Sequence, residues 1–263
     1  MPASLPTILA STRHRLPALR RRSSELEAAA LAAPKTVPWA NLFECGDVAV
    51  IAEVKRRSPS AGPIADDLDP VEHARSCQAG GARAISVLTD AEYFGGSLAD
   101  LRAVRAGVQV PVLRKDFILD PVQLYESRAA GASAVLLIVR ALDRVLLAEL
   151  SRLARELGLD VLAEVHSLAE LDSALLVTPA SIGVNSRDLM TFEVDVESTA
   201  AILQAVPGSV PAVAESGLKH RTDIERVAEW GADAVLVGTA LASAPDPSRA
   251  VATLTGVPRR GRG

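Results

Sequence analysis

The sequence contains a short apolar segment that ends in charged residues able to act as an acid and a base. Val48 to Val54 has the sequence VAVIAEV, and alternation along a strand would place Glu53 and Lys55 on the same face as Ile51. The opposite face is also apolar, so the charged face must point into the protein. Because burial of a single charge is costly, we expect Glu53 and Lys55 at the rim of a cavity. Taken alone, the pair fits a structural ion pair as well as a functional site.

Four further apolar segments end in polar side chains. The residues expected to share the inward face at these ends are Lys115, Glu164, Asn185 and Glu215. With the first pair, three carboxylates and two ammonium groups would meet in one cleft. Groups this close shift one another's pKa values and provide an acid and a base together. Any one of them would fit a solvated or ion-paired position, but the joint pattern predicts a catalytic site.

A recurring glycine-alanine junction indicates how the chain positions these groups. Gly81-Ala82, Gly131-Ala132 and Gly231-Ala232 each end a helix-like segment and precede an aliphatic, strand-like one. If one strand-helix unit takes about 25 residues, the junctions recur at every second unit. This spacing predicts a strand-helix repeat that is sustained through the chain.

Eight strands are expected, each followed by a helix. The strands are expected near residues 48–54, 84–88, 111–115, 134–138, 160–164, 181–185, 211–215 and 234–237, and the helices near 70–79, 97–106, 121–130, 142–157, 167–175, 196–205, 219–230 and 246–254. Asp120-Pro121 and Asp246-Pro247 are typical helix starts, with an N-cap followed by proline. Eight units fit a closed (β/α)8 barrel, an α/β fold of about 250 residues, better than a doubly wound sheet with fewer strands. Catalytic groups gather at the C-terminal ends of barrel strands, which is where the polar residues lie.

The segments outside the repeat are expected to be an extension and a tail. Residues 1–47 should form a helical and partly flexible N-terminal extension, with a helix at Ser23 to Ala33, residues 48–255 the barrel, and residues 256–263 a flexible basic tail. The first 24 residues contain five arginines and no acidic residue, a composition similar to a transit peptide. Because three prolines interrupt this stretch, a solvated basic leading segment is the preferred interpretation.

The overall composition describes an ordinary soluble globular protein. Of the 263 residues, 49% are hydrophobic and 23% charged, with a net charge of −4, which gives no electrostatic case for nucleic acid. The longest near-apolar run, Ala132 to Val139, is too short to span a membrane. Cys45 and Cys77 show neither metal-ligand spacing nor a disulfide framework, and His166 has no partner evident in the sequence. We therefore expect a cytoplasmic protein without a metal.

Two loops near the end of the repeat could bind a phosphate. Barrels often hold phosphate in the loops after strands 7 and 8, where Ser216-Gly217 and Gly238-Thr239 lie. Glycine allows backbone N–H groups to approach the anion, and residues 239–242 could form the short helix that accompanies such sites. Each pair alone could be an ordinary turn, but the two together predict a phosphorylated substrate.

Seven segments resemble, in the same order, the motifs of the indole-3-glycerol-phosphate synthase family. They are IAEVKRRSPSAGPI, SVLTDAEYFGGSL, PVLRKDFILDPVQLYESRAAGA, LAEVH, IGVNSRDLMTFEVD, AESGL and LVGTAL, between about Val48 and Pro247. The resemblance implies a (β/α)8 lyase of tryptophan biosynthesis that needs no cofactor. Its substrate would be 1-(2-carboxyphenylamino)-1-deoxyribulose 5-phosphate, which is closed to indole-3-glycerol phosphate with loss of carbon dioxide and water.

The resemblance also implies residue roles. Lys115 would be the general acid that protonates the carbonyl oxygen, and Glu164 the acid/base residue of the dehydration, with Lys55 a competing candidate. Glu53 and Asn185 would orient lysines and substrate hydroxyls. Glu215 would complete the polar ring, Ser58, Arg187, Ser216, Gly217, Gly238 and Thr239 would contact substrate and phosphate, and Phe94, Phe117 and Leu136 would form apolar walls for the anthranilate ring.

Two parts of the sequence depart from the family pattern. The segment before the first strand is poorly matched, and GTALA stands where family members more often have Gly-Glu-Ser or Gly-Ser-Ser followed by Leu-Met. The resemblance suggests that the helix at Ser23 to Ala33, which must bury Leu26 and Leu31, covers the mouth of the barrel. A peripheral segment, or one that plugs the opposite end, is the alternative.

Other functions compatible with a phosphate-binding barrel are an isomerase, an aldolase and a non-catalytic binder. A phosphoribosylanthranilate isomerase would use a Cys/Asp pair, but neither Cys45 nor Cys77 lies at a strand end. An aldolase would need a lysine that forms a Schiff base. A binder needs no acid and base, so the presence of Lys115 with Glu164 argues against it. The oligomeric state expected is a monomer or a weak homo-oligomer.

Overall fold

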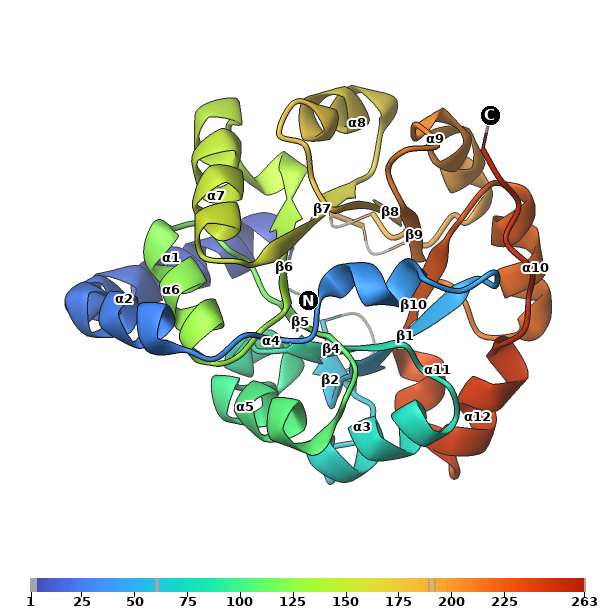
Figure 1. Ribbon diagram of the computed structural model, residues 1–263, viewed down its shortest axis with the longest axis horizontal. Helices are drawn as coiled ribbons and strands as arrows, with labels where there is room; N and C mark the ends of the chain where they lie inside the picture. Colours follow the sequence, from blue (N-terminus) through green and yellow to red (C-terminus); the bar gives the residue numbers. More distant parts are fainter. Residues whose placement is uncertain (1–3, 60–61, 189, 192, 263) are drawn as a thin grey trace.

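The computed structural model describes residues 4–59, 62–188, 190–191 and 193–262, and it contains a closed parallel barrel (Figure 1). The barrel strands follow one another around the sheet in chain order, and the last pairs with the first. The fold class predicted from the sequence is therefore confirmed. The barrel strands are β1 (Ala49–Val54), β4 (Ala84–Leu88), β5 (Val112–Lys115), β6 (Ala134–Ile138), β7 (Asp160–Val165), β8 (Ser181–Asn185), β9 (Ala212–Glu215) and β10 (Ala234–Val237), and β2 (Arg57–Ser58) pairs with β3 (Gly62–Pro63) in the loop after β1.

The helices surround the barrel (Figure 1), and several of them begin at a side-chain cap. The side chains of Asp69, Asp120 and Asp246 each accept a backbone N–H at a helix start that carries proline in its first turn. The main helices are α3 (Pro70–Ala79), α5 (Leu98–Gly107), α6 (Pro121–Ala129), α7 (Arg144–Glu156), α8 (Leu168–Leu175), α9 (Ala200–Ala205), α10 (Arg221–Glu229) and α12 (Pro247–Leu254), and the shorter ones are α4 (Ala91–Phe94), η2 (Val139–Ala141), η3 (Glu197–Thr199) and α11 (Thr239–Ala242).

The glycines of the recurring junction all have positive φ. Gly81, Gly131 and Gly231 have φ values of 103°, 87° and 93°, a region that other residues rarely adopt. Each one ends a helix so that the chain can turn back into the next strand. The repeated motif of the sequence is thus the helix-to-strand turn of the barrel.

Side-chain alternation divides the buried residues into two cores. One lies between the strands and the helices. The other fills the barrel interior and includes Ile51, Leu113 and Leu162, each fully buried. Because one face of each strand points inward, the last inward position of a strand lies at the C-terminal end of the barrel.

The N-terminal extension begins with a helix that the sequence analysis missed. α1 (Leu5–Arg20) contains Pro17, although proline was expected to interrupt a helix here. Pro6 lies in the first turn, where its missing N–H is not needed. The helix is stabilised by the burial of Leu5, Ile8, Leu9, Thr12 and Leu16, which form one stripe along it.

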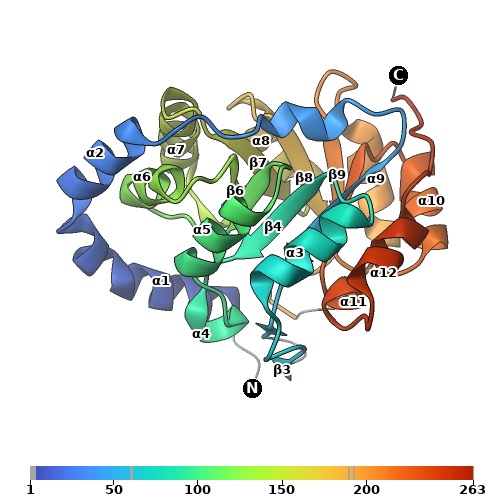
Figure 2. The same ribbon diagram turned by 60° about the horizontal axis from the view of Figure 1, so that its bottom comes forward.

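The extension runs from one end of the barrel to the other (Figure 2). α2 (Ser23–Ala32) confirms the expected helix and packs against α6 on the outside. It buries Leu26, but Leu31 is 73% exposed, so the expectation that both leucines are buried is wrong for Leu31. The chain then reaches η1 (Trp39–Phe43), whose Trp39 Nε1 donates to Ser181 Oγ at the start of β8 over 3.0 Å.

The end of the chain packs near the starts of the strands, at the N-terminal end, or floor, of the barrel. The Val48 N–H donates to the Val257 carbonyl over 2.7 Å, and Arg262 forms an ion pair of 2.8 Å with Asp233. The flexibility expected for this tail, like the domain bounds, stays a prediction. No helix in the described part of the chain is long and apolar enough to cross a membrane.

The Trp39–Ser181 hydrogen bond predicts a coupled effect on stability. Trp39→Phe leaves the buried Ser181 hydroxyl unpaired and should lower the free energy of unfolding by about 1–3 kcal/mol. Adding Ser181→Ala to Trp39→Phe should cost almost nothing more, since the unpaired hydroxyl is then gone. Urea denaturation of the wild type, both single variants and the double variant measures the coupling. Additive losses would show that the hydrogen bond does not stabilise the floor.

Candidate active site

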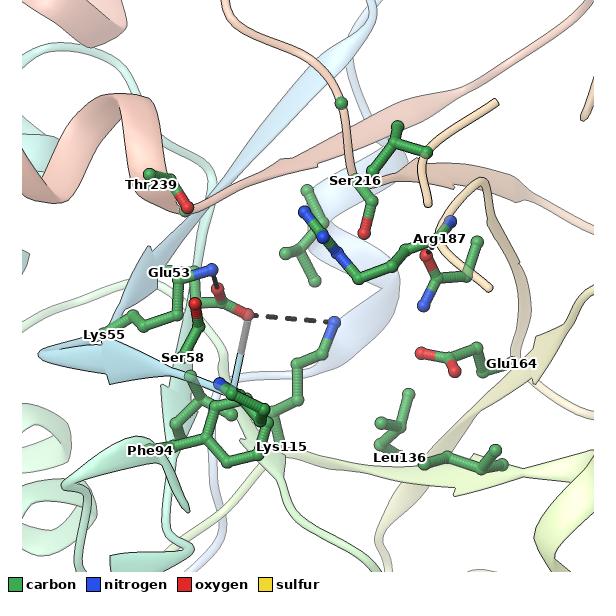
Figure 3. A pocket seen from close by; sticks show the side chains of 18 of the residues that line it. Glu53, Lys55, Ser58, Phe94, Lys115, Leu136, Glu164, Arg187, Ser216 and Thr239 are labelled. Carbon is green, nitrogen blue, oxygen red and sulfur yellow. Dashed lines mark hydrogen bonds and ion pairs between the residues drawn. The ribbon is translucent and has the colours of Figure 1, made fainter. Parts of the chain in front are cut away.

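The C-terminal ends of the strands surround a cavity of about 510 Å³ (Figure 3). Every site residue predicted from the sequence lines this cavity except Glu215, which lies beneath it in contact with Lys115. The predicted residues that line it are Glu53, Lys55, Ser58, Phe94, Lys115, Phe117, Leu136, Glu164, Asn185, Arg187, Ser216, Gly217, Gly238 and Thr239. The topology therefore brings together residues spread over 187 positions of the chain, from Glu53 to Thr239.

The charged groups form a connected cluster at the base of the cavity (Figure 3). Lys115 Nζ lies 2.5 Å from Glu215 Oε2 and 3.7 Å from Glu53 Oε2. Lys55 Nζ lies 2.9 Å from the other oxygen of Glu53. Because the members come from β1, β5 and β9 or the residues just after them, the barrel itself holds the cluster together.

These contacts keep Lys115 positively charged. Burial alone would lower the pKa of Lys115, but the carboxylates of Glu215, Glu53 and Glu164 raise it above its usual range. Burial likewise opposes the charge of Glu53, but Lys55 and Lys115 lower its pKa below the usual range. The base of the cavity thus holds an ammonium group surrounded by acids.

The pKa of Glu215 is shifted in the opposite direction to that of Glu53. Burial raises the pKa of Glu215 to about 7, and Glu164 and Glu53 add to the rise, while Lys115 opposes it. The pKa values of Lys115 and Glu215 are thus both raised, which favours the charged form of Lys115 and the neutral form of Glu215. We take Lys115 as the cation because three carboxylates act on it, and Glu215 as the carboxyl that accepts a proton first. Its Oε1 has no hydrogen-bond partner among the described residues.

Glu164 lies on the side of Lys115 opposite to Glu53 (Figure 3). Its side chain, at the end of β7, is 2% exposed. Asn185, the last residue of β8, accepts the Arg187 backbone N–H through Oδ1 over 2.9 Å. Asn185 and Glu164 therefore face the cavity from neighbouring strands.

Two inward-facing glycines leave room for the carboxylates. A Cβ at Gly238 would lie 2.2 Å from Glu53 Oε1, and one at Gly183 would lie 2.2 Å from Glu215 Oε1. Both distances are far below van der Waals contact. Gly238 was expected at the phosphate site alone, and the role of Gly183 has no signal in the sequence because it depends on a residue of another strand.

The loops after β9 and β10 face the cavity with their backbone. Ser216 and Gly217 have φ values of 68° and 73°, so both backbones are left-handed. Gly238 precedes the short helix α11, which begins at Thr239 as expected. Lys219 also lines the cavity, and the sequence analysis missed it.

The remaining wall is apolar. The rings of Phe94 and Phe117 lie 6.2 Å apart, and Leu136 lines the same cavity. Leu5 and Ile8 of α1 complete this lining. Their contribution was missed because the helix at Ser23 to Ala33 was expected to cover the mouth. That expectation is wrong, since α2 packs against α6 on the outside and α1 lines the cavity instead.

Arg114 alternates with the inward residues of β5 and does not line the cavity, whereas Asp116, which follows the strand, does. Arg114 Nη2 lies 2.8 Å from Asp116 Oδ2 and 2.9 Å from Glu126, so these charges form a structural network beside the cavity. Within the described ranges, no three His, Cys, Asp or Glu side chains are grouped so that they could hold a metal ion.

Comparisons with known proteins agree on one family. The model of the family described as indole-3-glycerol phosphate synthase matches residues 5–254. The indole-3-glycerol phosphate synthase of Mycobacterium tuberculosis (strain H37Rv) is 50% identical over 232 residues, which cover 88% of this chain and 85% of that protein. The protein of the same name from Mycobacteroides abscessus is 50% identical over 230 residues, covering 87% and 84%. A solved thiamine phosphate pyrophosphorylase from Pyrococcus furiosus shares the fold at 20% identity, with a TM-score of 0.58 and coverage of 79% and 93%.

The raised pKa of Glu215 predicts a titration that Glu215→Gln removes. One glutamate carboxyl of the wild type should titrate at a pH of about 7, and carbon-13 NMR of labelled glutamates measures it. Because this pKa is higher in the folded than in the unfolded protein, the wild type should lose stability relative to Glu215→Gln as the pH rises from about 4 to about 7. Urea unfolding across that range measures the loss.

Glu225→Gln is the matched control for this titration, because Glu225 is half exposed on α10. It should leave both the titration and the pH dependence of stability unchanged. A wild type in which every glutamate carboxyl titrates in the ordinary acidic range would contradict the raised pKa of Glu215.

Proposed function

Because this chain belongs to the indole-3-glycerol phosphate synthase family, we propose that its cavity closes 1-(2-carboxyphenylamino)-1-deoxyribulose 5-phosphate to indole-3-glycerol phosphate. Membership makes the chain a carboxy-lyase of tryptophan biosynthesis. The observation that carries the proposal is the ammonium group of Lys115, which three buried carboxylates hold in the charged state at the base of the cavity. Ring closure onto a carbonyl needs such a buried proton donor.

Lys115 acts as the general acid of the ring closure. The aromatic carbon that carries the carboxylate attacks the ketone carbon, and Lys115 gives its proton to the ketone oxygen. The C–C bond to the carboxylate then breaks, and carbon dioxide leaves with restoration of the aromatic ring. Glu215 and Glu53 hold the Lys115 ammonium group in place, so little reorganisation is needed during the step.

Glu164 acts in the dehydration. It removes a proton from the carbon next to the ring nitrogen while the hydroxyl formed in the first step leaves as water. The leaving hydroxyl needs a proton, and Lys55 and Lys115 are the ammonium groups of the charged cluster at the base of the cavity. Lys55 is the alternative donor for part of these proton transfers, because its Nζ is held 2.9 Å from Glu53 Oε1.

The two kinds of wall fit the two ends of the substrate. Phe94, Phe117 and Leu136 form the apolar side that would accept the anthranilate ring. The substrate phosphate would lie at the other side, where the glycine-containing loops turn their backbone toward the cavity. The residues proposed for the substrate and phosphate contacts are Ser58, Arg187, Ser216, Gly217, Gly238 and Thr239.

The cysteines do not favour an isomerase. Cys77 is fully buried on α3, and Cys45 follows η1 at the floor of the barrel. Neither residue lines the cavity. A cytoplasmic location and a monomer or weak homo-oligomer remain part of the proposal.

The direct test is incubation of the protein with the carboxyphenylamino deoxyribulose phosphate. Indole fluorescence should appear, and mass spectrometry should show loss of one carbon dioxide and one water. The dephosphorylated substrate should react far more slowly at equal concentration, because it lacks the anion that the loops bind. A folded protein that converts neither compound would overturn the proposed activity, and equal rates for the two would remove the phosphate site.

Lys115→Met should fold normally and lose turnover. General acid catalysis alone is worth about 10²–10⁴ in rate, and the lost charge also disturbs Glu215 and Glu53, so we expect a loss of at least that size. The control is Lys35→Met, which removes an exposed lysine from the linker before η1 and should change nothing. Steady-state kinetics with a melting curve checks both, and near-normal turnover of Lys115→Met would exclude the acid role.

A further inference from the structure

His166 lies between two carboxylates directly behind the cavity. Its Nε2 is 3.5 Å from Glu164 Oε1, and its Nδ1 is 3.4 Å from Glu170 Oε2. The His166 side chain is 4% exposed and the Glu164 side chain 2% exposed. The imidazole is therefore the buried link between the proposed base of the dehydration and a second carboxylate.

The start of α8 fixes this arrangement. Ser167 caps the helix and accepts the Glu170 N–H, while Glu170 reaches back and accepts the His166 backbone N–H over 2.8 Å. This is a capping arrangement in which serine and a glutamate three residues later satisfy the helix start. It places Glu170 beside the Nδ1 edge of the ring and leaves the Nε2 edge toward Glu164.

Glu170 is in turn held from the outside. Arg140 donates to Glu170 Oε1 over 3.0 Å and lies 3.8 Å from Asp188. Burial opposes the charge of Glu170, but the His166 side chain, the His166 backbone N–H and Arg140 lower its pKa below the usual range. An ionised Glu170 thus holds a carboxylate oxygen 3.4 Å from Nδ1.

The Glu164 side of the ring is not satisfied by anything else. Among the described residues, Glu164 Oε1 and both ring nitrogens of His166 lack a hydrogen-bond partner. Buried polar atoms are normally paired, and Glu164 Oε1 and His166 Nε2 are close enough to pair with each other. The 3.5 Å between Oε1 and Nε2 is the separation that a hydrogen bond between them would shorten.

We propose that His166 is a positioning residue for the reaction, which carries a proton on each ring nitrogen so that its Nε2–H aims the Glu164 carboxylate at the substrate while its Nδ1–H faces Glu170. The inference rests on the proposed function, in which Glu164 removes a proton from the substrate. It assigns a task to a histidine that the reaction scheme does not otherwise use. His166 does not line the cavity, so it acts through Glu164.

Two isosteric variants separate this role from a structural one. The amide nitrogen of His166→Gln falls near the Nε2 position and keeps a donor for Glu164, whereas that of His166→Asn falls near the Nδ1 position and keeps only the contact with Glu170. If His166 aims Glu164, Gln should retain most of kcat. Asn should lose about 10- to 100-fold in kcat with little change in KM, because misplacement of a catalytic group by about 1 Å has costs of that order.

The opposite order, with Asn active and Gln impaired, or equal activity of both variants and the wild type, would overturn the proposal and leave His166 a part of the helix cap. Crystal structures of the two variants provide a readout that needs no activity. The Glu164 carboxylate should stay in place in the Gln variant and turn away in the Asn variant, and an unmoved carboxylate in both would also refute the role. A wild type inactive in the assay would overturn the proposed function, while the two structures would still decide the position of Glu164.

Discussion

The structure depends on the compensation of charge at the base of the cavity. Glu53, Glu164 and Glu215 are almost completely buried, and each would be costly to ionise alone. The barrel solves this by bringing strands that are far apart in sequence to one ring, so that Lys55 and Lys115 lie among the acids. The same compensation leaves one proton donor and one carboxyl of raised pKa in contact, which is what acid-base chemistry needs.

Local patterns in the sequence predict the fold and most of the cavity lining. Alternation puts Glu53, Lys115 and Glu164 on inward faces, and the glycine-alanine junction predicts the helix-to-strand turns, because both signals come from neighbours in the chain. Features that depend on distant residues were not predictable. Gly183, for example, owes its place to Glu215 on the next strand. The two acidic neighbours of His166 lie close in sequence, at positions 164 and 170, but their approach to the ring depends on the strand end and the helix cap. The proline-containing helix α1 is stabilised by tertiary burial, which local propensity does not show.

The N-terminal extension contacts the barrel at both ends and on one side. α1 completes the wall of the cavity, and η1 closes the floor through Trp39. Arg15 and Arg20 of α1 bind Asp90 and Asp120, the same carboxylates that cap α4 and α6. Asp90 and Asp120 therefore fix both the position of α1 and the starts of α4 and α6. These two carboxylates connect the part of the cavity wall formed by α1 to the loops in which the two helices begin.

The glycines beneath the carboxylates limit how this barrel can diverge. A methyl group at position 183 or 238 would occupy the space of a Glu215 or Glu53 oxygen, so volume can be added there only if the acid moves out of its ion pair or becomes shorter. Positions 183 and 215, and positions 238 and 53, should thus change in pairs during evolution. A side chain at position 183 or 238 fits only after the facing acid has changed, so the order of the two substitutions is constrained.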